Sequence, residues 1–150
     1  MTLSGMLVAV GAFAQGQVNF AARVEGLYDA PVFAGFVANR AEGPAYMVQL
    51  YAGATQAGLA PVGAALPFLT GADAGYWTAE SRTITTVDAT GNAFVQIRAW
   101  STTAGPTYED ALAFGVGFGA SNILTVKPTT PPRWTGEFGG TPELRDIITW

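Results

Sequence analysis

Carboxylates are the acid–base groups that this 150-residue chain offers, because it contains no histidine and no cysteine. These absences exclude a Ser-His-Asp triad, a thiol nucleophile and an imidazole or thiolate zinc site. Glu25 and Asp29 flank a short Gly-Leu-Tyr stretch, and two carboxyl groups roughly 5–9 Å apart can hydrolyse a glycosidic bond. Glu109 and Asp110 are adjacent, would point about 100° apart on a helix, and are expected to stabilise its N-terminus. These residue types predict a protein that is not an enzyme, with a carboxylate-dependent glycosidase as the third hypothesis.

The acidic residues also lack the spacing of a metal site. The alternating acids of an EF-hand loop are missing, and Asp73 and Asp88 lie close to glycines in segments typical of turns. The glycine-rich segment at 114–119 does not lead from a strand into a helix followed by an acid, as a nucleotide-binding loop does. We therefore expect neither a metal ion nor a cofactor.

Aromatic rings are the other candidate binding groups. Tyr76, Trp77 and Trp134 could stack on the pyranose rings of a polysaccharide if they are exposed. Packing in a core or at a sheet corner is the alternative, because large rings bury the most area there. Trp100 is expected either on an outer face or packed beneath a helix that begins near Tyr108. A carbohydrate-binding module that uses the first three rings is therefore the alternative functional hypothesis.

Short runs with strand character, separated by turn residues, must position these groups. The stronger runs are 17–20, 45–52, 82–87 and 93–100, and the weaker ones are 29–33, 59–68, 121–126 and 145–150. The turn at 88–92 predicts that the runs before and after it form an antiparallel hairpin. About seven to nine strands at this spacing predict an all-β chain, folded as an antiparallel β-sandwich of the jelly-roll or immunoglobulin-like kind.

The strict alternation at 93–100 assigns the two faces of that strand. Val95, Ile97 and Ala99 should face the core. They should lie opposite Val48, Leu50 or their neighbours in the run at 45–52, whereas Gln96 and Arg98 should face outward. A slip of one residue would turn the arginine inward and bury an unpaired charge.

One segment departs from the β pattern. Thr107 is followed by two acids and then by an apolar stretch that ends at Gly115. This combination of an N-cap residue, a capping box with Asp110 and a terminal glycine predicts a short helix over residues 107–114. We expect this helix to cross between two sheets.

The start of the chain carries an export pattern. Residues 3–14 form an apolar run that ends in Ala-Phe-Ala and is followed by polar Gln15. Signal peptidase cuts after small residues at such a position, and the run is shorter than the roughly 20 apolar residues of a membrane span. Basic residues do not precede the run, since the first positive charge is Arg23. The pattern predicts a signal peptide over 1–14 and a single exported domain over 15–150, without a transmembrane segment.

Composition and charge narrow the class of partners. The net charge is −4 and the seven lysines and arginines are scattered singly, whereas nucleic-acid binding needs a basic stripe. A chain with 12% charged residues and many glycines suits an extracellular β protein. We expect extracellular polysaccharide or envelope components as partners, and no nucleic acid.

Several short segments recur, in the same order, in one group of proteins. They are Gln17-Val18-Asn19-Phe20, Asp29-Ala30-Pro31-Val32, Gln49-Leu50-Tyr51-Ala52-Gly53, Pro61-Val62-Gly63, Thr70-Gly71, Ala74-Gly75-Tyr76-Trp77, Val95-Gln96-Ile97-Arg98-Ala99-Trp100 and Thr107-Tyr108-Glu109. On these segments the chain resembles uncharacterised exported bacterial proteins, many of which end in a PEP-CTERM sorting signal. That signal itself, with its Val-Pro-Glu-Pro motif, is absent here. The resemblance implies export and an all-β fold and no particular reaction.

Together these observations favour a secreted or cell-surface β-sandwich protein with a structural, matrix or adhesion role.

Overall fold

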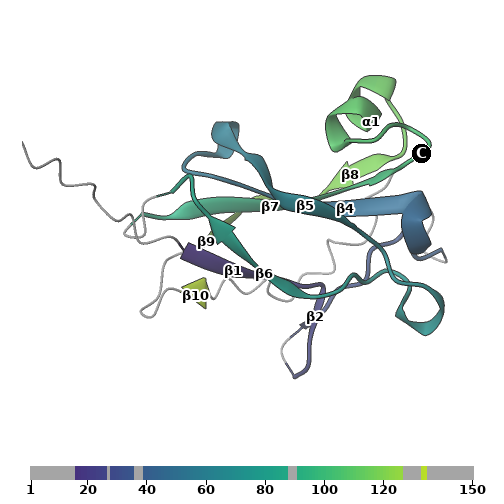
Figure 1. Cartoon of the computed structure of the whole chain (residues 1–150), viewed down its shortest axis with the longest axis horizontal. Helices are drawn as coiled ribbons and strands as arrows, with labels where there is room; N and C mark the ends of the chain where they lie inside the picture. The colour runs from purple at the N-terminus through teal and green to yellow at the C-terminus, as the bar shows by residue number, and fades with distance from the viewer. Residues whose placement is uncertain (1–15, 27, 36–38, 88–90, 127–132, 135–150) are drawn as a thin grey trace, which may run out of the picture.

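The computed structural model describes residues 16–26, 28–35, 39–87, 91–126 and 133–134, and over these residues the chain is mostly β (Figure 1). The strands are β1 (Gly16–Phe20), β2 (Arg23–Val24), β3 (Tyr28–Asp29), β4 (Tyr46–Gly53), β5 (Ala60–Pro67), β6 (Glu80–Ile84), β7 (Ala93–Ser101), β8 (Phe118–Ala120), β9 (Leu124–Val126) and β10 (Arg133–Trp134). They are joined by the helix α1 (Tyr108–Phe114) and by the 3-10 turns η1 (Gly43–Ala45), η2 (Gln56–Gly58) and η3 (Gly71–Asp73). The predicted β-rich chain with one short helix is confirmed.

The strands form two main sheets. In the larger sheet β5, β4 and β7 lie side by side, and β8 and β9 pair with different parts of the far edge of β7. All of these pairings are antiparallel. In the smaller sheet β1 lies between β6, which is antiparallel to it, and β10, which is parallel. Strands β2 and β3 form a separate short ladder.

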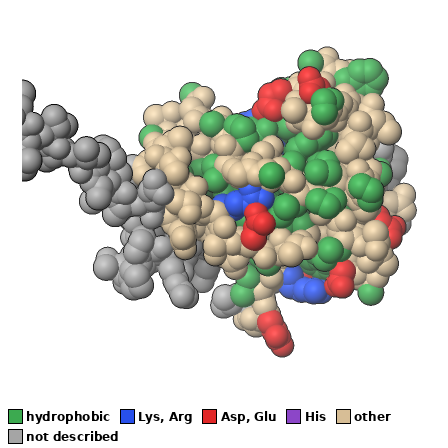
Figure 2. Space-filling model, viewed as in Figure 1, with side chains coloured by type: hydrophobic (Ala, Val, Ile, Leu, Met, Phe, Trp, Pro, Cys, Tyr) green, Lys and Arg blue, Asp and Glu red, His purple; other side chains and the backbone are tan. Residues whose placement is uncertain are grey.

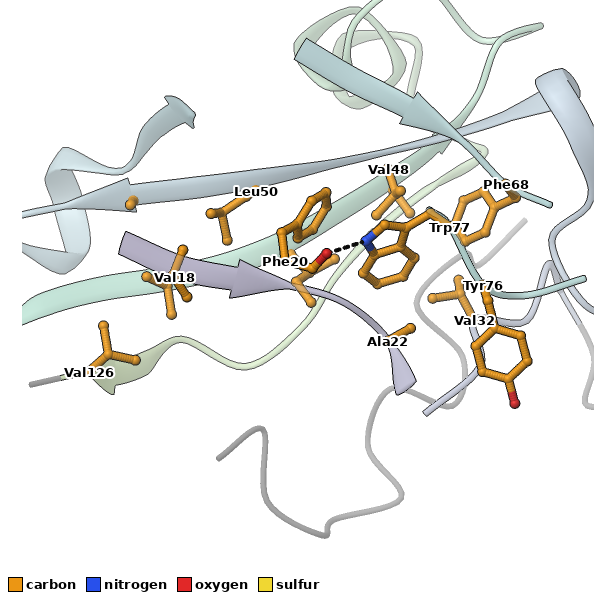
Figure 3. Packing of buried hydrophobic residues seen from close by; sticks show 14 of the residues in the cluster. Val18, Phe20, Ala22, Val32, Val48, Leu50, Phe68, Tyr76, Trp77 and Val126 are labelled. Atoms are coloured by element: carbon orange, nitrogen blue, oxygen red, sulfur yellow. Dashed lines mark hydrogen bonds between the residues drawn. The ribbon is translucent and has the colours of Figure 1, made fainter. Parts of the chain in front are cut away.

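One hydrophobic cluster takes side chains from both main sheets (Figure 3). The larger sheet contributes Val48, Leu50, Ala52, Val95, Ile97 and Ala99, and the smaller sheet contributes Val18, Phe20 and Ile84. Val95 and Ile97 are fully buried, as their alternation predicted. Burying a side chain of this size contributes roughly 1.5–3 kcal/mol relative to leaving it in water, so this shared cluster is the main source of stability.

The predicted hairpin between 82–87 and 93–100 is wrong. Strand β6 pairs with β1, whereas β4 pairs with β7 over the whole length of β4, with Leu50 opposite Ile97. The chain therefore passes from the smaller sheet to the larger one between β6 and β7. Alternation assigns the faces of a strand but not its partner, and both strands present buried faces to the shared cluster.

The arginine of β6 links the edges of the two sheets. Arg82 is only 6% exposed, and its guanidinium donates hydrogen bonds of 2.7 Å to the carbonyls of Val62 and Ala64 on β5. It also pairs with Glu80. Gly63 lies between the two acceptors with φ at +69°, and a Cβ there would overlap the Nη1 atom of Arg82. The glycine makes room for the arginine, and five hydrogen-bond donors suit it to carbonyls at a sheet edge.

Helix α1 begins and ends as predicted, but it connects different strands from those expected. Thr107 Oγ1 accepts from the backbone of Asp110, whose carboxylate accepts from the backbone of Thr107, and Gly115 ends the helix with φ at +90°. The helix joins β7 to β8, which are paired strands of the same sheet, so the expected crossing between sheets is wrong. It lies on the side of the larger sheet that faces away from β1 and β6 (Figure 1). Buried Tyr108 and Ala111 pack there against the sheet, because an apolar side of a helix needs an apolar surface.

The weaker predicted strands are confirmed in part. The run at 29–33 gives β3 and an isolated bridge between Phe33 and Arg40, 59–68 gives β5, and 121–126 gives β9. The predicted signal peptide and the run at 145–150 lie outside the described residues. Among those described, no helix is long and apolar enough to cross a bilayer.

Candidate binding site

The aromatic residues proposed from the sequence lie mostly in the interior. Trp77 is 4% exposed, its ring lies 4.9 Å from that of Phe20 and 6.0 Å from that of Phe68, and its Nε1 donates to the Phe20 carbonyl (Figure 3). Tyr76 is 5% exposed. The side chain of Trp134 lies outside the described part of the chain. In this structure neither Tyr76 nor Trp77 has an open ring face for a sugar.

Trp100 takes the second of its two predicted environments. It is 1% exposed and packs with Tyr51, Tyr108 and Ala111 between the larger sheet and α1. Its Nε1 has no hydrogen-bond partner among the described residues. The ring therefore stabilises the helix on the sheet and is not a surface platform.

A hollow of about 810 Å³ opens at the start of β4. Its described lining consists of Phe33, Ala34, Asn39, Arg40, Glu42, Tyr46 and Ala74. This volume is within the range of roughly 300–1,000 Å³ that ligand pockets occupy. The half-buried rings of Phe33 and Tyr46 give the hollow apolar surface, and the exposed Asn39, Arg40 and Glu42 give it polar groups.

Backbone hydrogen bonds fix the wall of this hollow. Ala34 N–H donates to the Asn39 carbonyl at 2.7 Å, and Ala41 N–H donates to the Val32 carbonyl at 3.0 Å. Ala41 is fully buried, so the residues on either side of it in the chain, Arg40 and Glu42, are held at the surface. Alternation around a buried alanine thus places two oppositely charged side chains at one opening.

Gly75 connects the wall to the rest of the fold. Its N–H donates to the Ala41 carbonyl at 2.7 Å, and its own carbonyl accepts from Val32 N–H at 2.9 Å. The φ of Gly75 is +88°, and a Cβ there would lie 2.9 Å from the Cβ of Pro31. Both the left-handed backbone and the close approach require glycine.

The two charged side chains of the hollow are positioned differently. Glu42 Oε1 accepts from Gly71 N–H at 2.8 Å. Arg40 donates to the Ala74 carbonyl at 3.4 Å and lies with its Cζ 5.4 Å from the ring centroid of Tyr76. Among the described residues Arg40 forms no ion pair, whereas Arg23, Arg82 and Arg98 each pair with a carboxylate. The guanidinium at the hollow thus has no carboxylate partner among the described residues.

Tyr76 lies behind Arg40 and is held by a second arginine. Its hydroxyl donates to Asp29 at 2.5 Å, and the Cζ of Arg23 lies 4.5 Å from its ring centroid. Arg23 in turn pairs with Asp73 at 3.1 Å. Burial and the hydrogen bond to Asp29 raise the pKa of Tyr76 above its usual value. The ring is thus a neutral, fixed support for the charged groups in front of it.

A second polar cluster lies on the outer face of the larger sheet, beside α1. Tyr51 donates to both carboxylate oxygens of Glu109, at 2.8 and 3.0 Å. Arg98 pairs with Glu109 at 3.5 Å and places its Cζ 4.1 Å from the ring centroid of Tyr51. Burial, followed by the hydrogen bond to Glu109, raises the pKa of Tyr51. These groups satisfy one another and hold the helix on the sheet.

The two adjacent acids at the start of α1 bind different partners. Glu109 binds Tyr51 and Arg98, while Asp110 caps the helix, so the two adjacent acids diverge as expected. Of the described residues that line the hollow, Glu42 is the single carboxylate. The described part of the chain holds no group of three or more acids that could bind a metal ion.

Comparisons with known proteins find no match: neither a family model, nor a curated protein, nor a solved structure is similar enough to this chain.

Sequence reasoning missed the residues of the hollow. Asn39, Arg40 and Glu42 come from a short polar run in a chain with few charges, and this run is the signal that the sequence offers. Phe33 lies at the end of the weak predicted strand at 29–33. Nothing in their spacing showed that residues 33, 46 and 74 would meet them.

Proposed function

We propose that this protein is an exported β-sandwich that acts at the cell surface or in the extracellular matrix, by structural contact and adhesion and without catalysis. The cluster shared by the two main sheets supports the sandwich, as does Arg82, which links a strand of each sheet. The apolar run before Gln15 supports export.

The main support for this proposal is that the charged side chains bind one another and the backbone of the fold. Glu25 aside, every described acidic side chain accepts a hydrogen bond or pairs with an arginine of the fold. On the face seen in Figure 2, the basic side chains lie beside acidic ones, and neither kind forms a separate patch. Charges arranged in this way stabilise contacts between elements, whereas a glycosidase needs two carboxyl groups that face a substrate.

Fractionation of the native host tests the proposal. The protein should be recovered from the envelope or the medium, and N-terminal sequencing should begin at Gln15. Recovery in the cytoplasm with Met1 retained would contradict it.

Carbohydrate binding is the second candidate function, and the hollow is the observation that favours it. Two half-buried rings and three polar side chains meet there, although Tyr76 and Trp77 do not provide them.

A further inference from the structure

We propose that the hollow at the start of β4 binds a neutral oligosaccharide, with Phe33 and Tyr46 against the sugar ring and Asn39, Arg40 and Glu42 on its hydroxyls. The inference deepens the proposed function and rests on it, because it names the ligand class through which an exported protein of this kind would adhere.

The lining matches both kinds of surface that a sugar presents. A pyranose ring has an apolar C–H face and an edge of hydroxyl groups that donate and accept hydrogen bonds. Phe33 and Tyr46 are half-buried residues of the lining and supply its aromatic surface, and Tyr46 also packs against the core cluster. Glu42 accepts, Arg40 donates, and the Asn39 amide does both. A sugar hydroxyl can thus find a partner both as a hydrogen-bond donor and as an acceptor.

The side chains of Glu42 and Arg40 already have partners in the fold before a ligand arrives. Glu42 is held by Gly71 N–H, and Arg40 is held by the Ala74 carbonyl and the ring of Tyr76. The backbone at Asn39 is tied to Ala34. Ordering a long side chain on binding costs about 0.5–1.5 kcal/mol, so groups held in this way bind more tightly than free surface side chains.

The charges favour a neutral ligand over an anionic one. An anionic sugar would pair with Arg40 but would also meet the carboxylate of Glu42 at the same opening. The chain as a whole carries a net charge of −4, which repels polyanions at low salt. A neutral sugar gains hydrogen bonds from both charged groups without this penalty.

Calorimetric titration of the purified full chain tests the proposal. The probes are cellohexaose, xylohexaose, mannohexaose and laminarihexaose, with a hexagalacturonate as the anionic comparator. At least one neutral probe should bind, and Glu42→Gln and Phe33→Ala should each weaken its affinity about tenfold or more, which corresponds to about 1.4 kcal/mol. Arg98→Gln, on the opposite outer face of the larger sheet, should leave the affinity unchanged.

Three outcomes would overturn the inference. They are no binding of any neutral probe, binding that survives both substitutions in the hollow, and a clear preference for the hexagalacturonate. Unfolding midpoints of Glu42→Gln separate lost binding from lost structure, since this variant retains an acceptor for Gly71 N–H. If the protein is exported but binds none of the probes, only the ligand assignment fails. If it is cytoplasmic, the proposed function fails as well.

Discussion

Two regions of this molecule use the same three kinds of side chain to different ends. Beside α1, the hydroxyl of Tyr51 donates to Glu109, and Arg98 lies over the tyrosine ring. Behind the hollow, the hydroxyl of Tyr76 donates to Asp29, and two arginines lie over that ring, one of which is Arg40. Each region thus combines a buried tyrosine with a carboxylate and a guanidinium.

The difference lies in how the charges are paired. Arg98 pairs with the same Glu109 that accepts from Tyr51, so the cluster beside the helix is closed. Behind the hollow, Asp29 accepts from Tyr76, while Arg40 pairs with no described carboxylate. A closed cluster holds two elements together, whereas an open one leaves a charged group for a ligand. Pairing, and not residue type, separates a structural contact from a candidate site.

The largest effect is expected where the closed cluster meets the sheet. Trp100→Ala removes the ring on which Tyr51 and Tyr108 pack, and such truncations of a buried aromatic cost about 3–5 kcal/mol. Urea unfolding followed by circular dichroism measures the loss. Phe114→Ala is the matched control, because this aromatic residue of α1 is 69% exposed and should cost under about 0.5 kcal/mol. Similar losses at the two positions would mean that α1 is not held through Trp100.

The two tyrosine hydroxyls provide the next test. Tyr51→Phe and Tyr76→Phe should each lower the free energy of unfolding by about 1.5–3 kcal/mol, because each loses a hydrogen bond to a carboxylate. Double-mutant cycles with Glu109→Ala and Asp29→Ala isolate the pairwise energies. A coupling energy near zero in either cycle would show that the hydroxyl and the carboxylate do not interact in solution.

Local signals in the sequence were enough to predict much of the fold. The helix carries its start and stop signals within nine residues, from Thr107 to Gly115, and these signals act through local hydrogen bonds. The faces of β7 follow from strict alternation and the cost of burying an unpaired charge. The partner of β6 did not follow, because pairing depends on contacts between residues far apart in the chain.

The candidate site was harder to predict for the same reason. The sequence suggested Trp77 because of its size, but size favours burial as strongly as it favours binding, and the ring is in the core. The hollow joins Phe33, Glu42 and Ala74, which come from three separate segments. Only the folded chain brings those segments together.

Alkaline pH should weaken the closed cluster. Burial, and to a smaller extent the hydrogen bond to Glu109, raises the pKa of Tyr51 in the folded state. A tyrosine in the unfolded chain has a pKa of about 10. The unfolded chain therefore loses this proton first, so the stability that the neutral tyrosine provides is complete below pH 10 and declines as pH rises above it. Unfolding midpoints should fall less between about pH 9 and about pH 11 in Tyr51→Phe than in the parent. An equal fall in both proteins would mean that Tyr51 titrates normally in the folded state.

The smallest effect on stability is expected at the open arginine. Arg98→Gln removes an ion pair, contacts with two tyrosine rings and a hydrogen bond to Gln96, and should cost about 0.5–1.5 kcal/mol. Arg40→Gln removes one long hydrogen bond and one distant ring contact, and should cost under about 0.5 kcal/mol. Urea unfolding of both variants under the same conditions makes the comparison. If Arg40→Gln proves as costly as Arg98→Gln, Arg40 is a structural residue, and the hollow is closed by its own charges in the way that the helix cluster is.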